Sequence, residues 1–136
     1  MPTVGYSGTP LAKKLGVKPA SRICAIGAPE NYAELLAPLP DGVKFERRPN
    51  SRTDIAHVFT VHKDELSAHL RSLREKLSAE AAIWVSWPEK ASKVSTTITE
   101  DAIRELAFPL GLVDVKVCAV TEVWSGLKLV VRRELR

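Results

Sequence analysis

The stretch SRICAIGAPENYAELL, residues 21–36, reads as a buried strand that runs directly into a helix. An apolar run followed by a glycine, and then by apolar positions at helical spacing, is typical of the first strand–helix unit of an α/β protein. Many such proteins bind a nucleotide at this turn, and a dinucleotide-binding turn uses three glycines there. Here Gly27 is the one glycine, so the usual phosphate-binding backbone is not present in that form.

Two continuous apolar runs further along the chain are typical of central parallel strands covered on both faces: IAHVFTV (55–61) and AAIWVSWP (81–88). Between them, DELSAHLRSLREKL (64–77) carries leucines every three or four residues, which predicts an amphipathic helix. Another helix is expected to begin after Thr99, whose side chain can accept a hydrogen bond from the first turn, and to end at Gly111.

Shorter elements complete the order. Thr9 can cap a short helix that ends at Gly16, and VKFER (43–47) alternates as a short strand. The chain closes with two alternating strands, LVDVKVCAV (112–120) and LKLVVRREL (127–135). The connection TEVWSG is too short for a crossover helix, so these two strands should pair antiparallel.

The resulting order is helix, strand, helix, strand, strand, helix, strand, helix, strand, strand. Alternating units of this kind predict an α/β fold with a three-layer, Rossmann-like sheet that is mostly parallel and ends in an antiparallel hairpin. At 136 residues and 45% hydrophobic, the chain suits a single domain over residues 1–136.

Composition argues against several classes of protein. No apolar run approaches the roughly 20 residues of a membrane span, and the N-terminus has no apolar signal core, so we expect a soluble, cytoplasmic protein. Cys24 and Cys118 lie in strand-like runs without CxxC spacing, which favours buried, reduced thiols. The three histidines are too scattered to indicate a metal site, and His57 is expected to be a satisfied core residue.

Three segments resemble a bacterial family of small domains that has no assigned activity: YSGTPLAKKLG (6–16), WVSWPEKAS (84–92) and GLVDVKVCAVTEVWSGLKLVVRR (111–133). The resemblance covers nearly the whole chain and implies a fold rather than a function. The architecture itself resembles the class I methyltransferase fold in a reduced version, with at least one helix missing between the second and third strands. A fold does not fix a function, so the site must be argued from its residues.

In open α/β sheets, ligands bind outside the carboxyl ends of the strands. The loop PEKASK is the most suggestive one there, because it would place two cations and a hydroxyl, from Lys90, Ser92 and Lys93, close to the helix that starts at Thr99. Such a cluster would hold a phosphate or a carboxylate, although a solvated loop explains the same residues.

Other candidate ligand-binding residues follow from the same expectation. Gly27 and Arg48 follow the first and second strands, and Ser7, Thr9 and Lys13 would join the cluster if the first helix packs over this edge. Trp124 lies in the predicted turn, either folded back on the sheet or offered to a partner. Trp84 and Trp87 are expected to point to the same face as packing residues.

A methyltransferase of this fold normally needs a glycine-rich first loop and an acid after the second strand for the ribose of S-adenosylmethionine. The second strand instead ends in Arg47 and Arg48, and Glu46 is one position early, where alternation can turn it away. The arginines would suit a ribose 2′-phosphate, but the glycines of an NADP site are missing as well. We therefore expect no cofactor, with S-adenosylmethionine as the alternative.

No pattern in the sequence identifies a reaction. There is no GxSxG turn, no HExxH helix and no cysteine with a plausible histidine neighbour. The leading hypothesis is a non-catalytic binding or regulatory module that recognises an anionic small molecule or a protein partner. The alternative is an S-adenosylmethionine-dependent, methyltransferase-like enzyme with an atypical cofactor pocket. Nucleic-acid binding through KFERRPNSR (44–52) is a third hypothesis, which the absence of interleaved aromatic residues disfavours.

Overall fold

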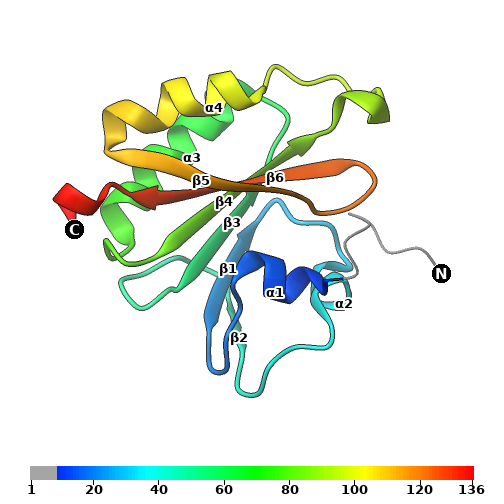
Figure 1. The fold of residues 1–136 in the computed structure, drawn as a ribbon, viewed down its shortest axis with the longest axis vertical. Coiled ribbons are helices and arrows are strands. Elements are labelled where there is room, and N and C mark those ends of the chain that lie inside the picture. Colours follow the sequence, from blue (N-terminus) through cyan, green and yellow to red (C-terminus); the bar gives the residue numbers. More distant parts are fainter. Residues whose placement is uncertain (1–8) are drawn as a thin grey trace.

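A computed structural model describes residues 9–136 (Figure 1). The strands are β1 (Arg22–Ile26), β2 (Lys44–Glu46), β3 (Ile55–Phe59), β4 (Ala82–Pro88), β5 (Leu112–Ala119) and β6 (Trp124–Val131). The α-helices are α1 (Leu11–Leu15), α2 (Tyr32–Leu36), α3 (Lys63–Lys76) and α4 (Glu100–Ala107). Three single 3₁₀ turns are η1 (Lys90–Ser92), η2 (Phe108–Leu110) and η3 (Arg133–Leu135).

The six strands form one sheet in the order β2-β1-β3-β4-β6-β5. β2, β1, β3 and β4 run parallel, and β6 pairs antiparallel with both β4 and β5. The predicted fold class is confirmed: the sheet is parallel through its middle and ends in an antiparallel hairpin. Because β1, β3 and β4 are neighbours and point the same way, their carboxyl ends meet at one edge.

Helices cover both faces of the sheet (Figure 1). On one face, α3 and α4 bury a core that includes Leu70 and Ile103. On the other face, the five-residue helices α1 and α2 bury a second core that includes Leu15 and Leu36. The sheet is therefore the middle layer of three.

The two tryptophans of β4 belong to different cores. Trp84 packs in the core under α1 and α2, whereas Trp87 packs in the core under α3 and α4. The prediction that they share a face was wrong, because residues three apart on a strand point to opposite faces.

Helix ends depend on local chemistry. Thr99 is the N-cap of α4, as predicted, and its hydroxyl accepts a hydrogen bond from the Ala102 amide at 3.0 Å. At α1, Pro10 rather than Thr9 occupies the N-cap position, because Pro10 has an extended conformation with ψ 143° and the helix starts one residue later. The predicted Thr9 cap is therefore wrong, while the predicted end at Gly16, with φ 83°, is confirmed.

The hairpin turn lies earlier than expected. β5 ends at Ala119 and β6 begins at Trp124, so the connection is residues 120–123. Trp124 and Ser125 therefore start a strand instead of forming a turn. No helix in the described part of the chain combines the length and the apolar character needed to cross a bilayer.

Candidate functional site

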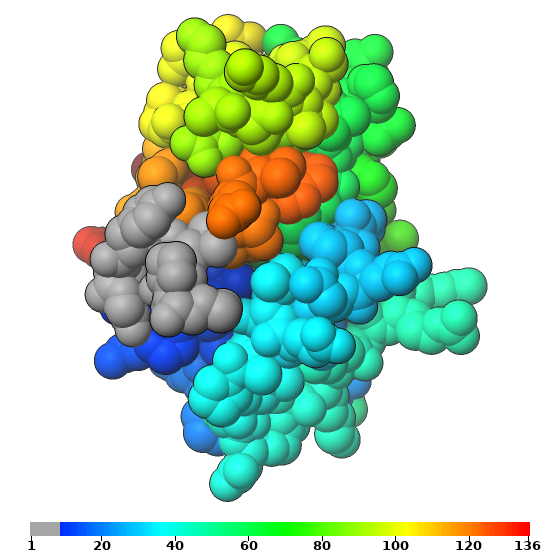
Figure 2. All heavy atoms as spheres, turned by 90° about the vertical axis from the view of Figure 1, so that its right-hand side faces the viewer, coloured from blue at the N-terminus to red at the C-terminus, as the bar shows by residue number. Residues whose placement is uncertain are grey.

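The candidate site is the carboxyl edge of the parallel strands. β1, β3 and β4 reach this edge in step, since Ile26 pairs with Val58 and Phe59 pairs with Ser86. Figure 2 shows this side of the molecule: the segment after β4, the hairpin turn between β5 and β6, and the segment after β1 follow one another from top to bottom. Segments far apart in the sequence thus share one surface.

Gly27 brings the exits of β1 and β3 into close contact. Its φ is 69°, and a Cβ added at this position would lie 2.5 Å from the carbonyl oxygen of Phe59. Only glycine fits such a backbone without displacing β3. The glycine that the sequence singles out is therefore required by strand packing, whatever it binds.

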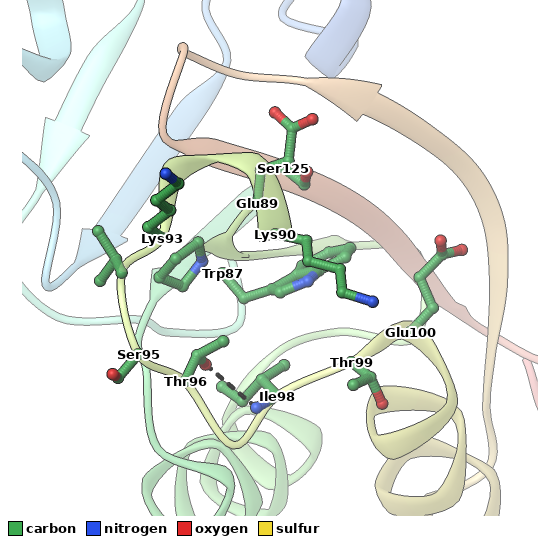
Figure 3. A pocket seen from close by; sticks show the side chains of 12 residues that line it. Trp87, Glu89, Lys90, Lys93, Ser95, Thr96, Ile98, Thr99, Glu100 and Ser125 are labelled. Carbon is green, nitrogen blue, oxygen red and sulfur yellow. Dashed lines mark hydrogen bonds between the residues drawn. The ribbon is translucent and has the colours of Figure 1, made fainter.

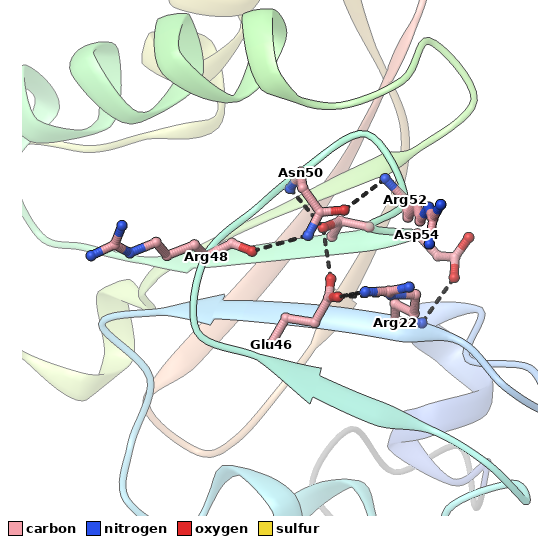
Figure 4. Close-up of polar contacts among 7 residues, drawn as sticks. Arg22, Glu46, Arg48, Asn50, Arg52 and Asp54 are labelled. Atoms are coloured by element: carbon pink, nitrogen blue, oxygen red, sulfur yellow. Dashed lines mark hydrogen bonds and ion pairs between the residues drawn. The ribbon is translucent and has the colours of Figure 1, made fainter.

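Glu46, at the end of β2, does not reach this edge. The last pair between β1 and β2 joins Cys24 to Glu46, so β2 stops level with the middle of β1. The Glu46 carboxylate accepts hydrogen bonds from Arg22 Nε at 2.7 Å and from the Thr53 hydroxyl at 2.9 Å (Figure 4). Partial burial would raise the pKa of Glu46, but the hydrogen bonds from Arg22, Thr53 and Asn50 outweigh it and lower the pKa.

Arg48 also lies apart from Gly27. The loop after β2 folds back to the amino edge of the sheet, where the Asp54 amide donates to the Arg22 carbonyl at 2.8 Å. The Arg48 side chain is exposed and extends away from the Glu46 network (Figure 4). The structure therefore does not bring Arg48 together with the other candidate residues.

A cavity of about 580 Å³ opens beside the exit of β4 (Figure 3). Lys90 and Lys93 both line it, as does Ser125 of β6, which pairs with Trp87. The other lining residues are Trp87, Pro88, Glu89, Val94, Ser95, Thr96, Ile98, Thr99 and Glu100. Part of the predicted lysine cluster thus lies at a formed cavity.

Ser92 stabilises the loop instead of facing the cavity. Its hydroxyl donates to the Glu89 carbonyl at 2.6 Å and accepts from the Val94 amide at 3.2 Å. These bonds close the η1 turn between Lys90 and Lys93, so Ser92 positions the two lysines.

Sequence reasoning missed Trp87. The residue is 8% exposed, and its indole N–H donates to no other described residue. Trp84 differs, because its indole N–H donates to the Leu15 carbonyl at 3.1 Å. The odd spacing of the two tryptophans was the signal that could have placed Trp87 on the cavity side.

Trp124 is folded back on the sheet. Its ring meets Phe59 edge to face, with centroids 5.2 Å apart. It also lines a second cavity of about 370 Å³, between the start of α2 and the hairpin turn. Asn31 and Glu122 are polar residues on opposite sides of that cavity.

Lys13, the candidate cation of the opening segment, does not join the lysine cluster. α1 packs on the face opposite α3 and α4, and the exposed Lys13 lines neither of these two cavities. Thr9 is half-buried just before α1. Ser7 lies outside the described residues.

His57 is a buried core residue, as predicted. Its Nδ1 lies 2.7 Å from the Tyr32 hydroxyl, and its Nε2 lies 2.7 Å from the Ser86 hydroxyl. Complete burial lowers the pKa of His57 to about 3, so the ring is neutral at physiological pH. Residues 9–136 hold no group of three or more His, Cys, Asp or Glu placed to bind a metal ion.

Comparison with solved structures adds to this geometry. A SAM-dependent methyltransferase from Aquifex aeolicus superposes with a TM-score of 0.65 at 12% identity, over 89% of this chain and 87% of that one. The chain has a methyltransferase-like fold. N,N-8-amino-8-demethyl-D-riboflavin dimethyltransferase (RosA) from Streptomyces davawensis gives a TM-score of 0.63 at 13% identity, over 81% of this chain and 49% of that one.

A variant of LepI, in complex with SAH and a substrate analogue, gives a TM-score of 0.58 at 14% identity. The match covers 91% of this chain and 47% of LepI, so the chain spans about half the length of that protein. No protein-family model matches the chain, and no curated protein matches its sequence. The resemblance to a bacterial family of small domains therefore stays a prediction.

These neighbours correct two predictions. The leading hypothesis, a non-catalytic module for an anion or a protein partner, is contradicted, because the solved proteins that share the methyltransferase-like fold include a SAM-dependent methyltransferase and other methyltransferases. The expectation of no cofactor is contradicted as well, since some of these structures contain SAM or SAH. Both errors came from giving the missing motifs more weight than the fold class, which the sequence predicted correctly. The alternative hypothesis is the one that the comparison favours.

Proposed function

We propose that this protein binds S-adenosylmethionine at the carboxyl edge of β1 and β3 and acts as a methyltransferase-like enzyme with an atypical cofactor pocket. The observation that carries the proposal is the strand order, which gathers the exits of β1, β3 and β4 at one edge. In open α/β sheets this edge is where ligands bind. Similarity to the solved methyltransferases supports the same reading.

Of the two features that a cofactor site needs at this edge, the glycine turn is present and the acid after β2 is not. The left-handed turn at Gly27 exposes backbone without a side chain, as close approach of a ligand requires. The acid of β2 does not fit, because Glu46 is already bound by Arg22 and Thr53 and lies level with Cys24. The ribose would need a different partner.

Glu30 is our candidate for that partner. It lies three residues after Gly27, is exposed, and forms no ion pair with any residue in the described part of the chain. When bound, the cofactor supplies an electrophilic methyl group. The role we assign to this chain is to bind and orient, with Gly27 admitting the ligand and Glu30 accepting hydrogen bonds from the ribose.

Isothermal titration with S-adenosylhomocysteine tests the proposal. We expect a dissociation constant in the micromolar range, which corresponds to about −8 kcal/mol. Glu30→Gln should weaken binding about tenfold, because it removes a charged hydrogen-bond acceptor. Glu34→Gln, at an exposed acid within α2, is the matched control and should leave the affinity unchanged. No binding at millimolar ligand would overturn the proposed function.

We also propose that residues 1–136 form a single cytoplasmic domain. The six strands belong to one sheet, and both cysteines are free thiols, which a reducing compartment maintains. A single cooperative unfolding transition, the same by fluorescence and by circular dichroism, is expected. Two separate transitions would contradict the single domain.

A further inference from the structure

The cavity beside β4 combines an apolar interior with donors at its mouth. Trp87 and Ile98 are buried residues of its lining, and Pro88 and Val94 add further apolar surface. Lys90 and Lys93 bring two ammonium groups from the η1 loop. At about 580 Å³, the cavity falls in the size range of pockets that bind small molecules.

Trp87 supplies a donor that the fold leaves unused. The residue as a whole is 8% exposed, and its N–H has no hydrogen-bond partner among residues 9–136. The N–H itself keeps contact with solvent, since Arg132 Nε is the one buried side-chain nitrogen or oxygen without a partner in the described part of the chain. This donor lines the cavity, so a ligand that brings an acceptor atom would satisfy it.

The charged side chains that line the cavity and are not paired elsewhere sum to one positive charge. Lys90 and Lys93 form no ion pair with another described residue, while Glu100 is paired with Arg104 at 3.1 Å. Glu89 is the one remaining acid of the lining, so two cations face one anion. In Figure 3, Lys90 extends toward the side where Glu100 and Thr99 lie, whereas Lys93 extends away from them. A ligand with a single negative charge suits this balance better than a dianionic phosphate.

We propose that this cavity binds a small aromatic monocarboxylate, with its ring against Trp87, Pro88 and Ile98 and its carboxylate near Lys90 and the Trp87 N–H. The cavity and its lining residues are the evidence for the binding site. Its role as the methyl-acceptor site rests on the proposed function. β4 lies two strands from β1, a separation of about 10 Å, so a molecule in this cavity would lie beside a cofactor at the β1 and β3 exits.

Titration with benzoate, followed by NMR of the ¹⁵N-labelled protein, tests the site directly. The three tryptophans give three indole N–H signals, and Trp87→Phe identifies the signal of Trp87. We expect saturable binding at millimolar benzoate with a shift of the Trp87 signal. The Trp84 signal should stay in place, because that N–H already donates to Leu15, and Trp124 reports on the second cavity.

Variants separate charge from packing. Lys90→Gln should weaken benzoate binding about two- to fivefold, the range for an exposed charge pair. Trp87→Phe should weaken it about tenfold, because a hydrogen bond to a charged group is lost. Lys76→Gln, at an exposed lysine of α3 away from the cavity, is the matched control. Benzamide and phenyl phosphate test whether a single negative charge is required, and both should bind more weakly.

The site is overturned if benzoate fails to bind, if Lys90→Gln and Lys76→Gln behave alike, or if benzamide shifts the Trp87 signal equally. Lys90→Gln keeps this test valid even if Trp87→Phe does not fold. S-adenosylhomocysteine binding is measured separately. Benzoate binding without it would keep the site and overturn the methyltransferase role, whereas the reverse result would overturn the site alone.

Discussion

Gly27 shows how one residue can be required by packing. The hydrogen on its Cα faces the carbonyl oxygen of Phe59, where any other residue would place a carbon at 2.5 Å. Neither atom can retreat easily, because both belong to the backbone of neighbouring parallel strands. The glycine therefore fixes how closely β1 and β3 approach at their carboxyl ends.

Gly27→Ala should destabilise the protein strongly. The positive φ costs about 1 to 2 kcal/mol for an L-residue, and the overlap with Phe59 should raise the total to about 3 kcal/mol or more. Gly42→Ala is the matched control, since Gly42 has φ 76° but a Cβ there would lie 3.5 Å from Ala20. It should cost about 1 kcal/mol. Urea denaturation measures both, and equal losses would contradict a clash at Gly27.

His57 predicts a loss of stability in mild acid. Its pKa is about 3 in the folded protein and about 6.5 when unfolded, so between these values the unfolded chain binds a proton that the folded protein does not. Stability contributed by the neutral ring is complete above about pH 6.5. It falls by about 1.4 kcal/mol per pH unit as the pH drops toward 3.

His57→Gln should remove this slope from the pH dependence of the free energy of unfolding. Tyr32→Phe removes a hydrogen bond to the same ring without removing the titrating group. It should lower stability at every pH and keep the slope. Denaturation curves between pH 5 and 7 measure the slope, and an unchanged slope in His57→Gln would show that the pKa of His57 does not differ between the folded and unfolded protein.

At the scale of single residues, the surroundings of some side chains could be predicted from the sequence and those of others could not. His57 was placed in the core because a histidine inside an apolar strand is normally paired there, and the Tyr32 and Ser86 hydroxyls pair it. The Arg22–Glu46 pair could not be foreseen, since the two residues meet only through the register of β1 and β2. The Trp87 N–H has no partner because it lies at a cavity, and the spacing of apolar residues in a sequence does not show where a cavity lies.

Among the elements, α4 has the best-defined start. Thr99 caps it through the Ala102 amide, and Glu100 and Asp101 follow in the first turn, where the helix dipole favours negative charge. The helix positions one wall of the cavity beside β4. Its N-terminal turn therefore links helix stability to the shape of the candidate site.

Thr99→Ala should lower the free energy of unfolding by about 1 kcal/mol, the usual value of a lost N-cap. Ser95→Ala is the matched control, because Ser95 lines the same cavity but is exposed and forms no hydrogen bond with a described residue. It should change stability by less than about 0.5 kcal/mol. Thermal denaturation of the two variants side by side measures the difference.

The presence of a helix or strand was easier to predict than the residues at which it begins and ends. α3 was predicted within a residue of its observed bounds because fourteen residues carry a clear leucine stripe. The hairpin turn was displaced, since Trp124 and Ser125 pair with Pro88 and Trp87 of β4 and so belong to a strand. That pairing is a tertiary contact with a distant segment, and local turn preferences could not show it.

At the scale of the whole molecule, the two helical layers are unequal. One face of the sheet is covered by α3, with fourteen residues, and by α4, whereas the other is covered by two helices of five residues each. Helices that short are not stable alone and depend on packing against the sheet. The layer of α1 and α2 should therefore open first.

Native-state hydrogen exchange tests this order. Amides of α1 and α2 should exchange through openings that cost less free energy than those of β3 and β4, which lie in the centre of the sheet. Equal protection in both regions would show that the molecule opens only as a whole.

The overall fold was predictable because each strand–helix unit carries its own pattern, and the rules for connecting such units leave few topologies. The candidate site was predictable only in outline. Lys90 and Lys93 follow a strand that any α/β arrangement brings to the carboxyl edge, whereas Ser125 reaches the same cavity through antiparallel pairing with Trp87. Arg48 was misplaced because β2 stops after three residues.

The three tryptophans occupy three different neighbourhoods: Trp84 under α1 and α2, Trp87 beside α3 and α4, and Trp124 against Phe59 at the strand exits. Their fluorescence therefore carries separate information about each region. Variants that keep a single indole would emit from one region at a time, and stopped-flow traces from the three would give the sequence in which the regions lose contact during unfolding.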